Sequence, residues 1–118
     1  MNRINFKKLL TYIQYIPRIP KIILLIKNWP SYFLNWTNII NTDTTYFFRN
    51  GYEIKTTEGI DACTLNAIFI IEIYKKILED VSHFNQSTII DLGSNIGLFM
   101  IYTKIKIPKT KILCYEPL

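Results

Sequence analysis

The chain has 118 residues, of which 49% are hydrophobic and 14% aromatic, and its formal net charge is +5. This composition is typical of one small globular domain and excludes a disordered chain. The apolar runs are far shorter than the roughly 20 residues of a membrane-spanning helix. Cys63 and Cys114 show neither zinc-ligand spacing nor a disulfide pattern, so we expect no metal site and two buried, reduced thiols.

Residues 1–44 are predicted to form a basic helical extension. Six basic residues and no acidic residue precede Asp43, whereas eight basic and nine acidic residues follow from that position. Prolines divide this segment into short helices. An apolar stripe predicts the first, Pro20 opens the second, and Ser31 is the expected cap of the third. The stripe consists of Phe6, Leu9, Leu10, Ile13 and Ile16.

The basic arm leaves a second kind of function open. Basic and aromatic residues together can lie on an anionic membrane surface, so residues 1–40 allow a weak membrane-surface association. The alternative to an enzyme is therefore a membrane-associated or partner-binding module that uses this arm. No nucleic-acid partner is expected, because no nucleic-acid-binding motif accompanies the charge. No small-residue cleavage site follows an apolar core, so we expect a cytoplasmic protein, at most peripheral to the membrane.

Residues 45–118 are predicted to contain a hairpin, a helix and the start of a larger α/β domain. The runs 45–49 and 52–56 flank Asn50-Gly51, which predicts a hairpin with a type I′ turn. A helix capped by Asp61 or Thr64 follows and extends toward Ile77. The alternative is a helix that breaks near Glu72, because residues 68–71 are continuously apolar.

The last part of the chain is typical of a strand–helix–strand unit. Residues 87–92 form an apolar run that predicts a strand buried on both faces. A turn at Gly93 leads into a helix from about Ile96, capped by Ser94 or Asn95, with Gly97 allowing close packing on the strand. Residues 111–115 predict the second, parallel strand.

Acidic residues near both strand ends and the glycine turn favour an adenosine-containing cofactor. A dinucleotide cradle needs G-x-G-x-x-G, but Asn95 and Leu98 stand at its second and third glycines, which disfavours a nicotinamide or flavin oxidoreductase. Asp91, Gly93 and Gly97 match D-x-G-x-G-x-G, a pattern that suits S-adenosylmethionine, with Asn95 replacing one glycine. Glu116 is placed to accept hydrogen bonds from ribose hydroxyls. Without a ligand, the same residues would only cap strands and form a tight turn.

The run from Asp91 to Phe99, with Tyr115-Glu116-Pro117, resembles the FkbM-type methyltransferases. In that family the turn is typically D-(V/I/L)-G-(A/S)-N-I-G, and the second strand ends in F/Y-E-P. The hairpin region and Asn28-Trp29-Pro30 extend the resemblance over residues 28–118. It implies an α/β, Rossmann-like class I methyltransferase fold that is incomplete. Only the first β-α-β unit is expected, preceded by an N-terminal helical segment and a β-hairpin.

The resemblance also implies an S-adenosylmethionine-dependent methyltransferase that acts on a hydroxyl of a sugar, glycan or small metabolite. Asp91, Gly93, Asn95 and Gly97 would line the methionine and sulfonium side of the cofactor, and Glu116 would hold its ribose. Glu72 corresponds to an acid before the core that often approaches the cofactor. No catalytic base is identified, because it normally follows later strands. We expect the chain to be the N-terminal part of a longer methyltransferase, binding cofactor poorly and without catalysis by itself.

Overall fold

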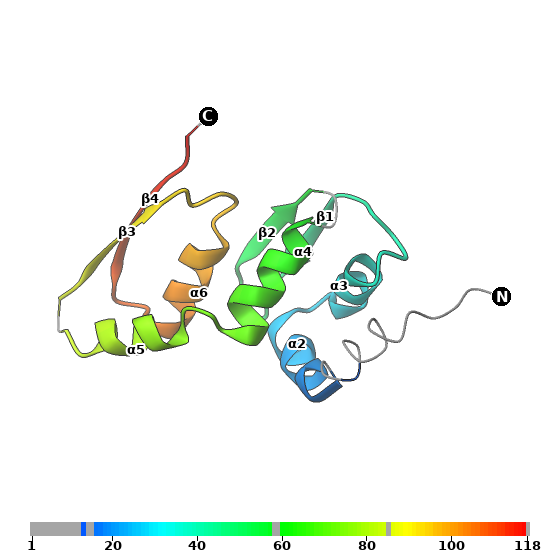
Figure 1. The fold of residues 1–118 in the computed structure, drawn as a ribbon, viewed down its shortest axis with the longest axis horizontal. Helices are drawn as coiled ribbons and strands as arrows, with labels where there is room; N and C mark the ends of the chain where they lie inside the picture. The colour runs from blue at the N-terminus through cyan, green and yellow to red at the C-terminus, as the bar shows by residue number, and fades with distance from the viewer. Residues whose placement is uncertain (1–12, 14–15, 58–59, 85, 118) are drawn as a thin grey trace.

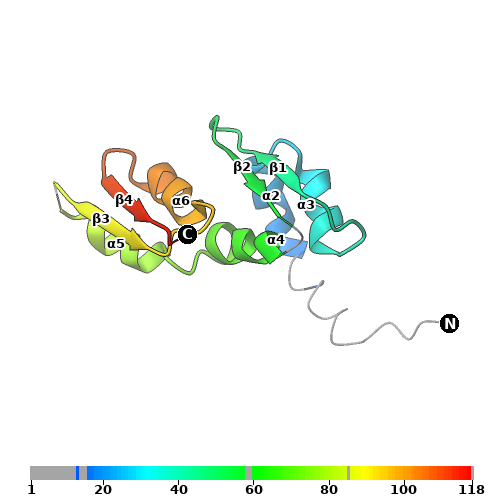
Figure 2. The same cartoon turned by 90° about the horizontal axis from the view of Figure 1, so that it is seen from above.

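The computed structural model describes residue 13 and residues 16–57, 60–84 and 86–117; most of the predicted first helix lies outside them. The described chain forms two lobes that lie side by side (Figure 1). We call them the hairpin lobe (residues 16–57) and the parallel-sheet lobe (residues 73–117). The connecting helix (residues 60–71) lies between them (Figure 2).

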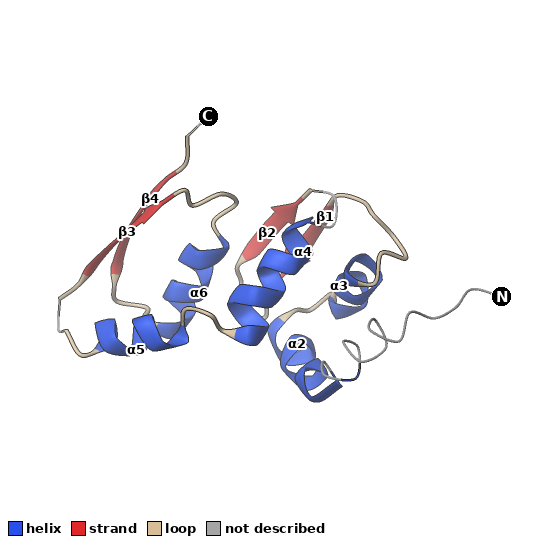
Figure 3. Ribbon diagram, viewed as in Figure 1, coloured by secondary structure: helices blue, strands red, loops and turns tan. Residues whose placement is uncertain are grey.

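The hairpin lobe combines short helices with an antiparallel strand pair, as predicted (Figure 3). Asn28 precedes the third helix and ties its start to the hairpin. The Asn28 side-chain amide donates to the Thr45 carbonyl at 2.8 Å, and its oxygen accepts from the Phe47 N–H at 3.0 Å. Asn28, not Ser31, therefore precedes the first turn of that helix. The elements are η1 (Ile16–Arg18), α2 (Ile19–Leu25), α3 (Trp29–Trp36), β1 (Thr44–Phe47) and β2 (Glu53–Thr56).

The hairpin turn differs from the predicted type I′ turn. That turn needs positive φ at both central residues, but Gly51 (φ +96°) has it and Asn50 does not. The Gly51 N–H donates to the Phe48 carbonyl at 3.1 Å, and the Phe48 N–H donates to the Tyr52 carbonyl at 2.8 Å. The connection therefore has three residues. A tertiary contact favours it, because the Arg49 N–H is held by the carbonyl of Leu25 at 3.0 Å.

The connecting helix joins the two lobes through a shared core. It consists of α4 (Ile60–Leu65) and the π-helical η2 (Asn66–Ile71). It ends at Glu72, so the alternative of a helix break near this residue is confirmed. Phe69 is 3% exposed. The centroid of its ring lies 5.0 Å from the ring centroid of Phe48 in the hairpin lobe and 5.5 Å from that of Tyr102 in the parallel-sheet lobe. Burial of this aromatic cluster holds the lobes together.

The parallel-sheet lobe contains α5 (Lys75–Ser82), β3 (Thr88–Leu92), α6 (Leu98–Lys106) and β4 (Lys111–Tyr115). Strands β3 and β4 pair in parallel, with Ile89 opposite Ile112 and Leu92 opposite Tyr115. The predicted strand–helix–strand unit is therefore confirmed. The prediction that the first strand is buried on both faces is wrong. Ile89 packs against the core, whereas Ile90 and Leu92 are 60% and 79% exposed on the opposite face.

Two further expectations concern burial. Cys63 and Cys114 are both exposed, so the expectation of buried thiols is wrong. The thiol of Cys114 lies near the exposed end of β4, and Cys63 lies on α4. Among the described residues, no helix has the length and apolar character needed to cross a membrane. The mixed α/β character is as predicted.

Candidate functional site

The turn after β3 is attached to the end of β4 by three consecutive backbone donors. The N–H groups of Gly93 and Ser94 both donate to the Tyr115 carbonyl, at 2.7 and 3.1 Å. The Asn95 N–H donates to Glu116 Oε2 at 2.6 Å. A charge-assisted hydrogen bond of this kind is among the stronger ones. Two predicted site residues, Asn95 and Glu116, are thus in direct contact although 21 positions separate them.

Positive φ angles explain the residue types of the turn. Gly93 and Gly97 have φ +84°, and Asn95 has φ +47°. Glycine takes this region freely, and asparagine is one of the few other residues that visits it readily. Asn95 therefore stands at a position of D-x-G-x-G-x-G whose left-handed conformation here suits both asparagine and glycine.

The predicted roles of the residues at the helix start need correction. Gly97 is the N-cap of α6, and no side chain caps it, so the prediction of Ser94 or Asn95 as the cap is wrong. A Cβ atom on Gly97 would meet only Met100 Cε, at an ordinary 3.6 Å. Close packing on the strand thus does not explain the glycine at this position. Its positive φ does.

A pocket of about 200 Å³ lies between this turn and the connecting helix. Asp91, Gly93 and Asn95, three of the residues predicted to bind a cofactor, line one side. The opposite side comes from segments that precede the β-α-β unit and from the first turn of α6. The residues there are Thr64, Ile68, Tyr74, Leu98 and Phe99. The sequence indicated Ile68 only as part of an apolar helix face and Thr64 only as a candidate helix cap. Tyr74 had no signal, because its place in the pocket depends on tertiary packing.

Asp91 is the charged residue of this pocket. Its Oδ2 atom is buried and accepts no hydrogen bond from the part of the chain that the structure describes. Burial raises the pKa of Asp91, and the nearby charge of Glu116 raises it further. None of the described residues that line the pocket is basic. Because the described lining carries one carboxylate and no basic group, the pocket suits a ligand that brings a positive charge or an N–H donor.

Glu116 faces a second, more open hollow of about 500 Å³ on the other side of Gly93. Leu92, Tyr115 and Pro117 supply its mainly apolar lining. Asp91 and Glu116 therefore lie in adjoining spaces that share Gly93, with apolar surface beside the second carboxylate. Gly97 lines neither space and acts on the site only through the shape of the turn.

Glu72 is not part of this site. Its carboxylate forms ion pairs with Lys21 at 2.8 Å and with Lys106 at 2.7 Å. Lys106 is the last residue of α6, whereas the glycine turn lies at the opposite end, before the first residue of that helix. Burial by itself would raise the pKa of Glu72, but hydrogen bonds and charge attraction from the two lysines outweigh it and lower the pKa to about 2. Glu72 does not line the pocket beside Asp91, and its expected approach to a cofactor stays a prediction.

Comparison with known proteins relates the chain to methyltransferases. It is 43% identical over 72 residues to methyltransferase sdnD of Sordaria araneosa, an alignment that covers 52% of this chain and 28% of that protein. It is 45% identical over 51 residues to methyltransferase 1 of Beauveria bassiana (strain ARSEF 2860), covering 42% of this chain and 18% of the relative. The chain thus spans less than a third of either relative. No protein-family profile matches it, and no solved structure matches it.

The turn geometry predicts a difference between two substitutions at Asn95. Asn95→Gly should leave the free energy of unfolding nearly unchanged, because glycine adopts φ +47° freely. Asn95→Ala should lower it by about 1 kcal/mol, because alanine is strained in the left-handed region. Urea unfolding followed by circular dichroism measures both values. An alanine variant as stable as the glycine variant would contradict the assigned turn.

The Glu72 ion pairs predict a pH-dependent contribution to stability. Because the folded pKa of about 2 lies below the ordinary 4.5, the contribution is complete above the unfolded pKa and decreases as pH falls toward the folded one. Glu72→Gln should lower the unfolding free energy by about 2 kcal/mol at neutral pH. The difference from wild type should shrink by about pH 3 in urea unfolding.

Glu79→Gln is the matched control, because its carboxylate is 62% exposed and 3.9 Å from Lys75. We expect the stability of this variant to stay close to wild type across the same pH range, as for most exposed ion pairs. A Glu72→Gln deficit that is the same at neutral and acidic pH would contradict the ion-pair interpretation.

Proposed function

We propose that this chain carries the cofactor-binding residues of an S-adenosylmethionine-dependent methyltransferase of the FkbM type. The observation that supports the proposal most is that Asp91 lines a pocket with no basic residue among its described lining residues. A second carboxylate, that of Glu116, lies nearby and accepts a hydrogen bond from the Asn95 N–H of the glycine turn. The relation to proteins named methyltransferases agrees with this reading.

The electrostatics favour this cofactor over a dinucleotide. S-adenosylmethionine carries a cationic sulfonium and an ammonium group, and it supplies an activated methyl group to an acceptor. A pyrophosphate would instead bring negative charge toward Asp91 and Glu116, and its usual glycine cradle is interrupted by Asn95 and Leu98. The charge of the site therefore supports the same choice as the glycine pattern.

The described residues divide into two roles around Gly93. Asp91 would accept a hydrogen bond from the amino group of the cofactor through its carboxylate, in the pocket that Thr64, Ile68 and Phe99 complete. Glu116 would accept hydrogen bonds from the ribose hydroxyls. It already accepts the Asn95 N–H through Oε2, so a ribose would either use its other oxygen or replace that N–H.

The acceptor in this proposal is a hydroxyl group of a sugar, glycan or small metabolite. Methyl transfer to a hydroxyl depends on positioning of the oxygen in line with the sulfonium methyl and on a general base. Asp91 and Glu116 are assigned to the cofactor, and we assign the base to neither. The proposed contribution of this chain is to hold the cofactor and to orient its methyl group.

The alternative, a membrane-associated or partner-binding module, depends on the basic N-terminal extension. Part of that charge is used inside the molecule, because Lys21 forms an ion pair with Glu72. The extension is also bonded to the hairpin, because Arg49 Nε donates to the carbonyl of Ile23 in α2 at 2.9 Å. These contacts favour a structural role for the described part of the extension, and the enzyme remains our proposal.

A two-dimensional ¹H–¹⁵N NMR titration tests the proposed cofactor. S-adenosylmethionine and S-adenosylhomocysteine should each shift the amide signals of Gly93, Asn95 and Glu116, with weak affinity for the chain by itself. NAD⁺ should leave these signals in place. Asp91→Asn and Glu116→Gln should each weaken binding by roughly tenfold, because each removes one charged acceptor and keeps the shape of the side chain.

Glu79→Gln serves as the control for lost negative charge, since Glu79 lies on α5 and lines neither of the two spaces beside Gly93. Its binding should equal that of the wild type. The proposal is contradicted if NAD⁺ shifts the turn signals as strongly as S-adenosylmethionine does, or if S-adenosylmethionine leaves them unmoved.

A further inference from the structure

Glu72 occupies an unusual backbone position between two helices. It follows η2, a single π-helical stretch, and has φ +59° and ψ +49°, in the left-handed region. A non-glycine residue there is strained by on the order of 1 kcal/mol or more and persists when its surroundings fix it. Short π-helical stretches also occur frequently at functional sites. The question is what fixes this break and what the break achieves.

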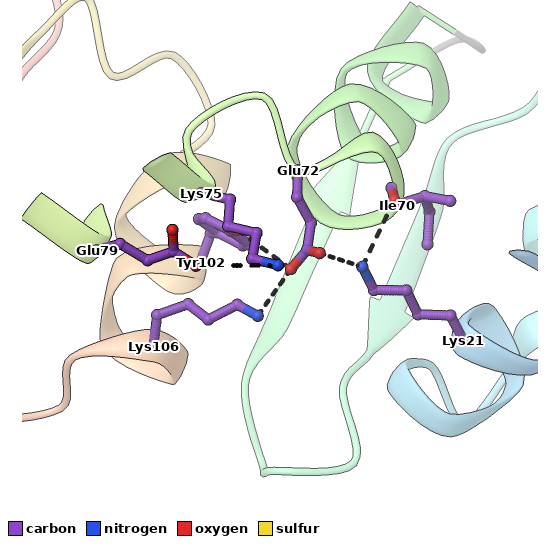
Figure 4. A network of polar contacts seen from close by, with 7 residues as sticks. All are labelled: Lys21, Ile70, Glu72, Lys75, Glu79, Tyr102 and Lys106. Carbon is purple, nitrogen blue, oxygen red and sulfur yellow. Dashed lines mark hydrogen bonds and ion pairs between the residues drawn. The ribbon is translucent and has the colours of Figure 1, made fainter. Parts of the chain in front are cut away.

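The carboxylate of Glu72 connects the helix break to α2 and α6 (Figure 4). It pairs with Lys21 Nζ of α2 at 2.8 Å and with Lys106 Nζ of α6 at 2.7 Å. The hydroxyl of Tyr102, also on α6, donates to Oε1 at 3.2 Å. Lys21 Nζ in addition lies 3.5 Å from the carbonyl of Ile70, just before the break. We call Glu72, Lys21, Lys106 and Tyr102 the Glu72 clamp.

Burial makes the Glu72 clamp more than a surface contact. The Glu72 side chain is 16% exposed, against 41% for each lysine. The Tyr102 side chain beneath it is buried in the core, where it meets Phe69 edge to face. Both oxygens of the carboxylate have a partner, so the buried charge is compensated. The clamp thus connects the break to the core and to both lobes.

The break determines which residues face the pocket beside Asp91. Ile68 precedes it and Tyr74 follows it, and both line that pocket. On a continuous α-helix two residues at this spacing would be about 120° apart around the axis and would point to different sides. The π-helical stretch and the left-handed Glu72 bring both to the same space. There the Tyr74 ring lies 4.6 Å from that of Phe99, in the first turns of α6.

We propose that Glu72 is a positioning residue for the pocket beside Asp91. Through the Glu72 clamp it holds the helix break in the shape that sets Ile68 and Tyr74 against the glycine turn. The clamp thereby couples α2 of the N-terminal extension to ligand binding at a site that α2 does not touch. The identity of the ligand rests on the proposed function, whereas the coupling of the clamp to the pocket wall does not.

Two measurements on the same variants test this inference. The first is amide hydrogen exchange of residues 66–74 without ligand. The second is the affinity for S-adenosylhomocysteine from the NMR titration. Glu72→Gln keeps the size of the side chain and removes its charge, and Lys21→Met removes one ion pair from a helix remote from the pocket. Both should exchange faster around the break and bind S-adenosylhomocysteine roughly tenfold more weakly.

Glu79→Gln is the charge control and should match the wild type in both measurements. If Glu72→Gln does not fold, Lys21→Met decides the outcome, because it leaves Glu72 with Lys106 and Tyr102. Unchanged exchange and unchanged affinity in the folded variants would overturn the inference and leave the proposed function standing. Failure of the wild type to bind S-adenosylhomocysteine would count against the proposed function, and hydrogen exchange would still decide whether the clamp holds the break.

Discussion

The attachment of the glycine turn to the end of β4 is the constraint on which the candidate site depends. Gly93, Ser94 and Asn95 direct three successive N–H groups at Tyr115 and Glu116. Parallel pairing of β3 and β4 brings the carboxyl ends of both strands to one edge, and the three donors fix the turn there. As a result two carboxylates lie in adjoining spaces although they are distant in sequence. Positive φ at alternate positions of the turn makes this arrangement possible.

Local chemistry was readable from the sequence, and tertiary packing was not. The hairpin, the parallel strand pair and the acids at the strand ends follow from short-range patterns, and the structure has them. Asn95 stands at a glycine position of the pattern with φ +47°, which both residue types accept. The bare face at Ile90 and Leu92 was missed, since an apolar run does not reveal how many faces are covered. Thr64 and Tyr74 reach the pocket only through the way the connecting helix packs.

Glu72 has a structural role that the sequence did not indicate. Its place before the core suggested contact with a cofactor, and in the structure it joins α2, the helix break and α6. The clamp relates the N-terminal extension to the pocket, which gives the described part of that extension a structural purpose besides its charge. The alignments with relatives named methyltransferases cover less than a third of the length of each relative.

The most direct measurement for the proposed site is a set of intermolecular nuclear Overhauser effects between the chain and bound S-adenosylhomocysteine. Protons of the amino-acid end should show contacts to Thr64, Ile68 and Phe99, and ribose protons should show contacts to Tyr115 and Glu116. Contacts confined to the polar hollow beside Lys109 and Lys111, where β4 begins, would contradict the assignment of the cofactor to the glycine turn.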